Sequence, residues 1–296
     1  MIERLIDISD AGGRVSVKHD QLTIAREESP PYSAPLDEVA VVVISHPAVT
    51  LTQSVLSGLM AHGAVFVVCD ERKLPSGMML PLEGHHLQGE RLEYQMNASQ
   101  PVRKRAWQQI VQAKILAQGR LLSELRGTDA GLLALANNVR SGDPDNLEGQ
   151  AARRYWPLIF GEVSFRRDND LAGLNSVLNY GYSVLRAIVA RAIVAAGLHP
   201  SIGVHHHNRY DAYRLADDLM EPFRPLVDRV AAALAAQYGF DLDLDKDTKR
   251  ALLSAFMGRY VVDGEDRSLF EVASRAAVSL VLVFQGRRKE LLLPEI

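Results

Sequence analysis

The hydrophobic pattern of the chain changes at one polar stretch, Glu83-Gly-His-His-Leu-Gln-Gly-Glu-Arg-Leu-Glu-Tyr-Gln95. Before this stretch, short apolar runs rich in β-branched residues predict strands. After it, nearly every periodic segment up to about residue 285 has helical spacing. The stretch contains Gly84 and Gly89, and we interpret it as a linker. The sequence therefore predicts an α+β fold, with a small β-rich domain at residues 1–88 followed by a larger all-helical domain at residues 96–296.

The N-terminal part carries the patterns of a hairpin and of buried strands. Residues 14–18 and 21–25 alternate between apolar and polar positions around a His19-Asp20 turn, which is typical of a β-hairpin. Residues 39–44 and 64–69 are short apolar runs, as expected of strands buried on both faces. Residues 51–62 have helical spacing and end at a glycine.

The C-terminal part has a series of helical patterns. The segment at residues 171–196 is long, alanine-rich and mostly apolar, and Gly197 follows it as a helix stop. Ser268 and Glu271 have the spacing of a capping box before the last helix. The predicted helices cover residues 106–125, 131–140, 146–160, 171–196, 212–237, 247–260 and 269–284.

Composition places the chain among ordinary globular proteins. Hydrophobic residues make up 47% and charged residues 23% of its 296 residues. The single cysteine, Cys69, excludes a disulfide framework and fits a reducing cytoplasm. The first residues carry an acid at once and lack the apolar region of a secretory signal. No uninterrupted apolar run reaches the roughly 18 residues of a membrane helix, so we expect no membrane contact.

The net charge of −3 does not have the sign typical of a DNA-binding module. Binding of nucleic acid would therefore depend on local basic groups. The alternative for each group is that its basic side chains simply lie on a solvated surface and contact no phosphate. The candidate groups are residues 103–105, Arg153 and Arg154, Arg166 and Arg167, and residues 287–289.

Two acids and three histidines form the strongest chemical pattern. His205, His206 and His207 precede a predicted helix on which Asp218 and Glu221, at positions i and i+3, share one face. Imidazole and carboxylate groups together suit a divalent cation. Successive side chains in an extended loop alternate, so at most two of the histidines can reach one site. The alternative is a partly solvated acidic edge, with Arg214 or Arg224 as the counter-charge, beside histidines that only pack.

Glu148 is a candidate for the third ligand of such a site. It falls in the first turn of a predicted helix, where an acid is also favoured by the helix dipole alone. The chain has no HExxH, CxxC or Walker pattern, which leaves zinc-protease and phosphate-loop chemistry without support.

The motifs are similar, in order and spacing, to those of the CRISPR-associated integrase, the endonuclease of spacer acquisition, in the versions from type II systems. They run along the whole chain. The matching segments are residues 59–70, 74–82, 148–156 (EGQAARRYW), 174–182 (LNSVLNYGY), 203–206 (GVHH) and 215–225 (LADDLMEPFRP).

The resemblance implies a catalytic site with one divalent metal, Mg²⁺ or Mn²⁺. The family motif consists of a glycine, two further residues and then the catalytic histidine, which selects His206 here, with His205 in reserve. The glutamate ligand of the family falls on Glu148. The second acid of the family's acidic motif falls on Glu221, and Asp218 takes a supporting role.

The resemblance also implies an activity and partners. The expected reaction is transesterification, in which a 3′-hydroxyl of a short double-stranded spacer precursor attacks a phosphodiester at the edge of a CRISPR repeat. The expected partners are this DNA, a second copy of the chain joined through residues 1–88, and a small second CRISPR adaptation protein. The residues expected to hold the DNA backbone are Arg153, Arg154, Arg166, Arg167 and Arg224. The alternatives are a structure-specific repair nuclease and a scaffold without catalysis.

Overall fold

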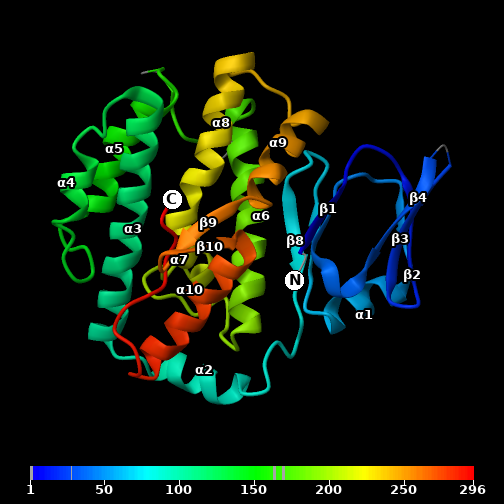
Figure 1. Ribbon diagram of the computed structural model, residues 1–296, viewed down its shortest axis with the longest axis horizontal. Coiled ribbons are helices and arrows are strands. Elements are labelled where there is room, and N and C mark those ends of the chain that lie inside the picture. The colour runs from blue at the N-terminus through cyan, green and yellow to red at the C-terminus, as the bar shows by residue number, and fades with distance from the viewer. Residues whose placement is uncertain (1–2, 28, 163–164, 169–170) are drawn as a thin grey trace.

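A computed structural model describes residues 3–27, 29–162, 165–168 and 171–296. Two regions lie side by side in Figure 1: two small sheets that carry the N-terminus, in blue and cyan, and a bundle of helices that runs from green to red. The predicted order, with β-rich structure first and helical structure after it, is confirmed.

The first sheet lies between the second sheet and the helices. Its strand order is β1-β5-β7-β8, in which β1, β5 and β7 are parallel and β8 is antiparallel to β7. All six residues of β5 are buried, because Val41 and Val43 face the helical core while Val42 and Ile44 face the N-terminal core. Burial on both faces explains the unbroken apolar run. The strands are β1 (Arg4–Ile8), β5 (Val39–Ile44), β7 (Val65–Cys69) and β8 (Pro75–Met79).

The second sheet contains the predicted hairpin. Its order is β4-β3-β2-β6, and β2 and β3 pair around His19 and Asp20, whose φ angles are 52° and 56°. Val55 and Leu59 of α1 are fully buried in the core between the sheets. The elements are β2 (Gly13–Lys18), β3 (Gln21–Arg26), β4 (Ser29–Pro35), the 3-10 helix η1 (Leu36–Glu38), β6 (Val49–Leu51) and α1 (Gln53–Ala61).

Helix α6 forms the axis of the helical region, where α7, α8, α10 and strand β7 contact it. This helix is long and apolar enough to cross a membrane, but 78% of its most apolar segment is buried inside the protein, as expected of a core helix. The helices are α2 (Gln88–Asn97), α3 (Gln100–Arg126), α4 (Leu132–Ala136), α5 (Leu147–Ile159), α6 (Leu174–Ala195), α7 (Arg214–Met220), η2 (Glu221–Phe223), α8 (Arg224–Tyr238), α9 (Lys246–Phe256) and α10 (Leu269–Phe284).

The interpretation of residues 83–95 as a linker was wrong for its second half, which belongs to helix α2. Gln95 is fully buried, and its side chain donates to the carbonyls of His199 and Ile202 at 3.0 and 2.8 Å. Arg91 donates to the carbonyl of Ala196 at 2.9 Å. The polar side chains that suggested a solvated linker thus bind the backbone that follows α6. The boundary between two domains stays a prediction.

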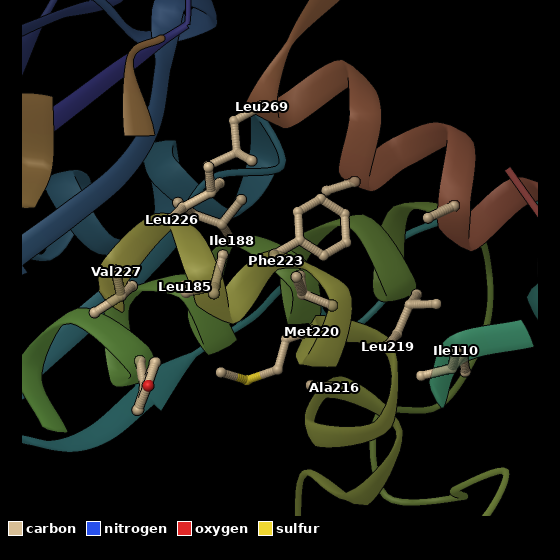
Figure 2. Close-up of a cluster of buried hydrophobic side chains, with 14 of the residues drawn as sticks. Ile110, Leu185, Ile188, Ala216, Leu219, Met220, Phe223, Leu226, Val227 and Leu269 are labelled. Atoms are coloured by element: carbon tan, nitrogen blue, oxygen red, sulfur yellow. The ribbon is translucent and has the colours of Figure 1, made fainter. Parts of the chain in front are cut away.

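The single helix predicted over residues 212–237 is also wrong, because the chain forms α7, the 3-10 turn η2 and α8 instead. Pro222 has no N–H to donate and its ring disfavours a continuous α-helix. The amide of Glu221 accordingly bonds to the carbonyl of Asp218 in the tighter pattern. Leu219 and Phe223 turn into the hydrophobic core around the joint (Figure 2).

The helical region contains one hairpin that the sequence analysis missed, β9 (Arg259–Val262) paired with β10 (Glu265–Ser268). Asp263 and Gly264 form its turn with φ angles of 53° and 70°. The predicted capping box follows directly: the amide of Glu271 donates to Ser268 Oγ at 3.2 Å, and the amide of Ser268 donates to the Glu271 carboxylate at 3.1 Å.

Candidate active site

One buried lysine joins two of the predicted site acids. Lys114, in the middle of α3, places its Nζ 2.6 Å from Oε1 of Glu148 and 2.6 Å from Oε2 of Glu221. Glu148 lies in the first turn of α5, and Glu221 begins η2. Only 12% of the Lys114 side chain and 5% of the Glu221 side chain are exposed. Three elements that are distant in sequence therefore meet at one ion cluster.

The start of α5 leaves the Glu148 side chain free for this cluster. The carboxylate of Asp143 accepts the amides of Leu147 and Glu148 at 2.8 and 3.0 Å, and the side chain of Asn146 accepts the amide of Gly149 at 3.1 Å. These contacts satisfy the first N–H groups of the helix. Favourable interaction with the helix dipole therefore does not fully explain Glu148, because its carboxylate is bound to Lys114.

The cations around Glu221 keep it ionised. Burial by itself would raise the pKa of Glu221, but the charges of Arg224 and Lys114 outweigh it and lower that pKa. Arg224 Nη2 contacts Oε1 of Glu221 at 3.1 Å. Oε2 accepts no aligned hydrogen bond from the described residues, although Lys114 Nζ lies within contact distance. Burial by itself would lower the pKa of Lys114, but the charges of Glu221 and Glu148 outweigh it and raise that pKa.

Asp218 fixes the histidine loop. Its fully buried carboxylate accepts the amides of Val204, His205 and His206 at 2.6, 2.9 and 3.2 Å, and Nδ1 of His206 at 2.5 Å. Since an ionised carboxylate only accepts, Nδ1 carries the proton and Nε2 of neutral His206 keeps a free lone pair. Gly203 is required at the start of this loop because a Cβ there would lie 2.9 Å from Oδ2 of Asp218.

The three histidines have different environments. The hydrogen bond that Nδ1 of His206 donates to the Asp218 carboxylate raises the pKa of His206, and the charges of Asp218, Glu221 and Glu148 add to this effect. His205 stacks on Trp107 with ring centroids 4.2 Å apart and an interplanar angle of 3°. His207 is exposed. The charges of both glutamates act on His206, which favours it over its neighbours as the histidine of the candidate site.

The five arginines predicted to hold DNA fall into two groups. Arg153, Arg154 and Arg166 are exposed. Arg224 pairs with Glu221 and lies over the ring of Tyr182, with its guanidinium carbon 4.9 Å from the centroid. Arg167 donates to the side chains of Asn175 and Asn179 at 3.1 and 2.6 Å. The geometry thus supports a surface role for the first group and favours internal roles for Arg224 and Arg167.

A buried acid behind Arg224 was not singled out from the sequence. Asp228 accepts hydrogen bonds from the hydroxyls of Tyr155, at 2.8 Å, and of Tyr182. Burial raises the pKa of Asp228 to about 6, although the two tyrosine hydroxyls act in the opposite direction. Tyr155 and Tyr182 are thus core residues.

The chemical types of the donor groups on Glu148, Glu221 and His206 suit a divalent ion. Glu148 and Glu221 supply carboxylate oxygens and His206 a free Nε2, which is a ligand set used by Mg²⁺- and Mn²⁺-dependent enzymes. Oε2 of Glu221 is a buried acceptor that lacks an aligned donor. Within the part of the chain that the structure describes, no three acidic, histidine or cysteine side chains are arranged closely enough to hold an ion by themselves. The ammonium of Lys114 lies between the two glutamates instead.

Comparison with known proteins assigns the family. A family model described as CRISPR associated protein Cas1 matches residues 6–261. A relative from Neisseria meningitidis serogroup C (strain 8013), a CRISPR-associated endonuclease Cas1, is 36% identical over 289 residues, which cover 96% of this chain and 94% of the relative. The chain belongs to the Cas1 family. The resemblance inferred from the motifs is thereby confirmed, and the expected enzyme class is the one that this Cas1 relative carries.

Two solved structures show the same fold at low sequence identity. A Cas1 protein from Thermotoga maritima superposes with a TM-score of 0.79 at 18% identity and covers 99% of this chain and 100% of its own. A casposase bound to integration product gives a TM-score of 0.79 at 21% identity, over 98% of this chain and 92% of the casposase. The chain therefore has the fold of a Cas1 protein, with a β-rich part before a helical part.

Proposed function

We propose that this Cas1 protein is a metal-dependent DNA integrase that inserts short double-stranded DNA fragments into a CRISPR array. The observation that carries the proposal is the shared contact of Glu148 and Glu221 with one ammonium, beside a histidine fixed by Asp218. Two acids held close together beside an oriented imidazole are a typical arrangement for phosphodiester chemistry. Membership in the Cas1 family and the likeness to a casposase captured with its integration product support the same reaction class.

In the proposed reaction, a 3′-hydroxyl of the incoming fragment attacks a phosphodiester at the edge of the repeat. A new P–O bond forms as the bond between the scissile phosphate and its 3′-oxygen breaks, and that oxygen takes up a proton and leaves as a free 3′-hydroxyl. The number of phosphodiester bonds is unchanged, so no nucleotide hydrolysis is needed. Glu148, Glu221 and Nε2 of His206 would hold the metal. Mg²⁺ or Mn²⁺, when bound, would polarise the scissile phosphate and lower the pKa of the attacking hydroxyl.

Other residues of the chain keep these groups in place. Asp218 holds the His206 ring through Nδ1, so that Nε2 is the ring nitrogen left to bind a cation. Arg224 holds Oε1 of Glu221 and leaves Oε2 as the oxygen that can accept a cation. The guanidinium of Arg224 is supported in turn by the ring of Tyr182, which Asp228 orients.

The same proposal includes partners. Arg153, Arg154 and Arg166 are exposed and would contact DNA phosphates, which makes binding dependent on salt. A homodimer through residues 1–88, a catalytic domain at residues 96–296, a small second adaptation protein and a cytoplasmic location are carried over from the family resemblance. An assembly of several subunits would supply the positive surface that a chain of net charge −3 does not supply alone.

A strand-transfer assay tests the proposal. Labelled fragments with a 3′-OH are incubated with a repeat-containing duplex, the purified protein and its adaptation partner, in Mn²⁺ or in EDTA. We expect joined products with Mn²⁺ only, while EDTA leaves DNA binding in place. Cleavage of branched DNA without joining would favour a repair nuclease. Joining that survives alanine at Glu148, His206 and Glu221 would favour a scaffold role.

A further inference from the structure

We propose that Lys114 is an internal counter-cation that occupies the position of the metal ion and must leave it when the ion binds. The inference rests on the proposed function, because it assumes that Glu148 and Glu221 hold an ion. It adds that the chain carries its own competitor for that ion. Lys114 thus sets the ion concentration at which the site becomes loaded, in addition to keeping the acids together before loading.

The space between the acids is the first argument. Nζ lies 2.6 Å from Oε1 of Glu148 and 2.6 Å from Oε2 of Glu221. An Mg²⁺ ion bound by the same two oxygens would lie about 2.1 Å from each. Both cations need the gap between these oxygens, so they exclude each other.

The choice of oxygen is the second argument. Glu221 has two carboxylate oxygens, and Arg224 already contacts Oε1 at 3.1 Å. The remaining atom, Oε2, is the one that Lys114 contacts. Lys114 also donates to Oε1 of Glu148, and its attraction for Oε2 helps to lower the pKa of Glu221. Oε2 is available to a stronger cation once the ammonium moves away.

The placement of the lysine is the third argument. Ile110 and Ile115 on the same helix are fully buried, so α3 is anchored next to the cluster. The lysine side chain is flexible, with four methylene groups, whereas the helix below it is fixed. The ammonium can therefore move without displacement of the backbone, while Glu148 and Glu221 stay where α5 and η2 hold them.

Charge balance gives the consequence for the protein without an ion. Two ionised glutamates in a buried place repel each other unless a cation lies between them. Lys114 supplies that cation, which keeps the site assembled. If Lys114 only held the acids together, its loss would weaken ion binding, because the acids would separate. If Lys114 competes with the ion, its loss should strengthen ion binding, because the ion no longer has to displace a charge.

The experiment compares Lys114→Met with Lys249→Met. Lys249 is a second buried lysine, 2% exposed, which donates to Ser45 Oγ at 2.8 Å and is not part of the cluster. Mn²⁺ affinity is measured by calorimetry, and the melting temperature is measured in EDTA and in saturating Mn²⁺. Lys114→Arg keeps the positive charge and serves as the conservative variant.

For Lys114→Met we expect Mn²⁺ to bind about tenfold more tightly than to the wild type. Its melting temperature should fall in EDTA and recover most of the loss in Mn²⁺. Lys249→Met should melt lower by the same amount in both conditions, with unchanged Mn²⁺ affinity. Lys114→Arg should bind Mn²⁺ no more tightly than the wild type does.

Two results would overturn the inference in distinguishable ways. If Mn²⁺ binds the wild type but binds Lys114→Met equally or more weakly, Lys114 is not a competitor, and the proposed metal site stands. If Mn²⁺ binds neither the wild type nor any of the variants, the metal site itself is absent, and the proposed function fails together with the inference.

Discussion

Glu221 and Asp228 are two buried acids on one continuous stretch of chain, η2 and α8, and their surroundings have opposite effects. Glu221 is 4% exposed and contacts two cations, which lower its pKa in spite of burial. Asp228 is 1% exposed and accepts two tyrosine hydroxyls, and burial raises its pKa to about 6. Burial alone therefore does not decide the charge of an acid. The balance between burial and the charge of the partners decides it, and this balance distinguishes an acid suited to a metal from one that supports the core.

The two acids are also linked. Asp228 holds the hydroxyl of Tyr182, the ring of Tyr182 carries the guanidinium of Arg224, and Arg224 contacts Glu221. Asp228 thus supports the candidate ligand Glu221 through two intermediate side chains, those of Tyr182 and Arg224. Substitutions at Glu221 and Asp228 should separate the two roles, because one removes a proposed ligand and the other removes only its distant support.

The largest expected difference is in strand transfer. Glu221→Ala should lower Mn²⁺-dependent joining at least 1000-fold, about 4 kcal/mol of transition-state stabilisation, because it removes a proposed ligand. Asp228→Asn should cost less than about tenfold, because the asparagine still offers an oxygen to a tyrosine hydroxyl. Circular dichroism checks that both variants fold. Near-normal joining by Glu221→Ala would remove this residue from the proposed site.

The next difference concerns stability and pH. The pKa of Asp228 is raised in the folded protein, so the folded state binds the proton more tightly than the unfolded state does. The contribution of Asp228 to stability is therefore fully present below its ordinary pKa, near 4, and is lost as the pH rises through about 6. Relative to Asp228→Asn, the wild type should lose about 2 kcal/mol of unfolding free energy between pH 4 and pH 7.

Urea denaturation of both proteins, followed by the fluorescence of Trp107 and Trp156, measures this change. All other titrating groups are shared, so the difference between the two proteins isolates Asp228. A difference that stays constant across this pH range would contradict the raised pKa.

The sequence was sufficient for elements with a clear hydrophobic pattern. Strand β5 is buried on both faces and helix α6 over most of its surface, which explains their largely apolar sequences, and both were predicted. Two missed elements had local signals. Pro222 ends α7, and Asp263-Gly264 is the dipeptide favoured in two-residue hairpin turns. The helix in the supposed linker had no such signal, since its polar residues are satisfied by carbonyls far along the chain.

The candidate site shows the same limit. Glu148, His206, Asp218 and Glu221 were selected from motifs, and the structure brings the two glutamates to one cation. Lys114 could not be selected, because a lysine inside a long amphipathic helix has the same local pattern whether it faces solvent or two acids. Its role appears only when α3, α5 and η2 are packed together. The roles of the motif residues themselves stay predictions.

Substitutions of the three neighbouring histidines should differ in their effect on joining. His206→Ala should lower joining about 100-fold, or roughly 2.7 kcal/mol, because Nε2 of His206 is a proposed ligand. His205→Ala loses a stacking contact with Trp107 and should cost less than tenfold, while His207→Ala, at an exposed position, should cost little. Initial rates at saturating Mn²⁺ measure the order. A larger loss at His205 or His207 would move the proposed ligand by one residue.

The smallest expected effect concerns the surface, where no buried partner fixes the charge. Arg153→Ala and Arg154→Ala should each weaken DNA binding a few-fold and reduce the slope of log affinity against log salt by about 1, because each removes one phosphate contact. Arg140→Ala is the matched control, since Arg140 is also exposed but is bound to Asp145 at 2.7 Å. Fluorescence anisotropy with a labelled duplex at several salt concentrations measures the slopes. Equal slopes for all three variants would show that the face of α5 that carries Arg153 and Arg154 does not meet the DNA, and the positive surface would then have to come from other subunits.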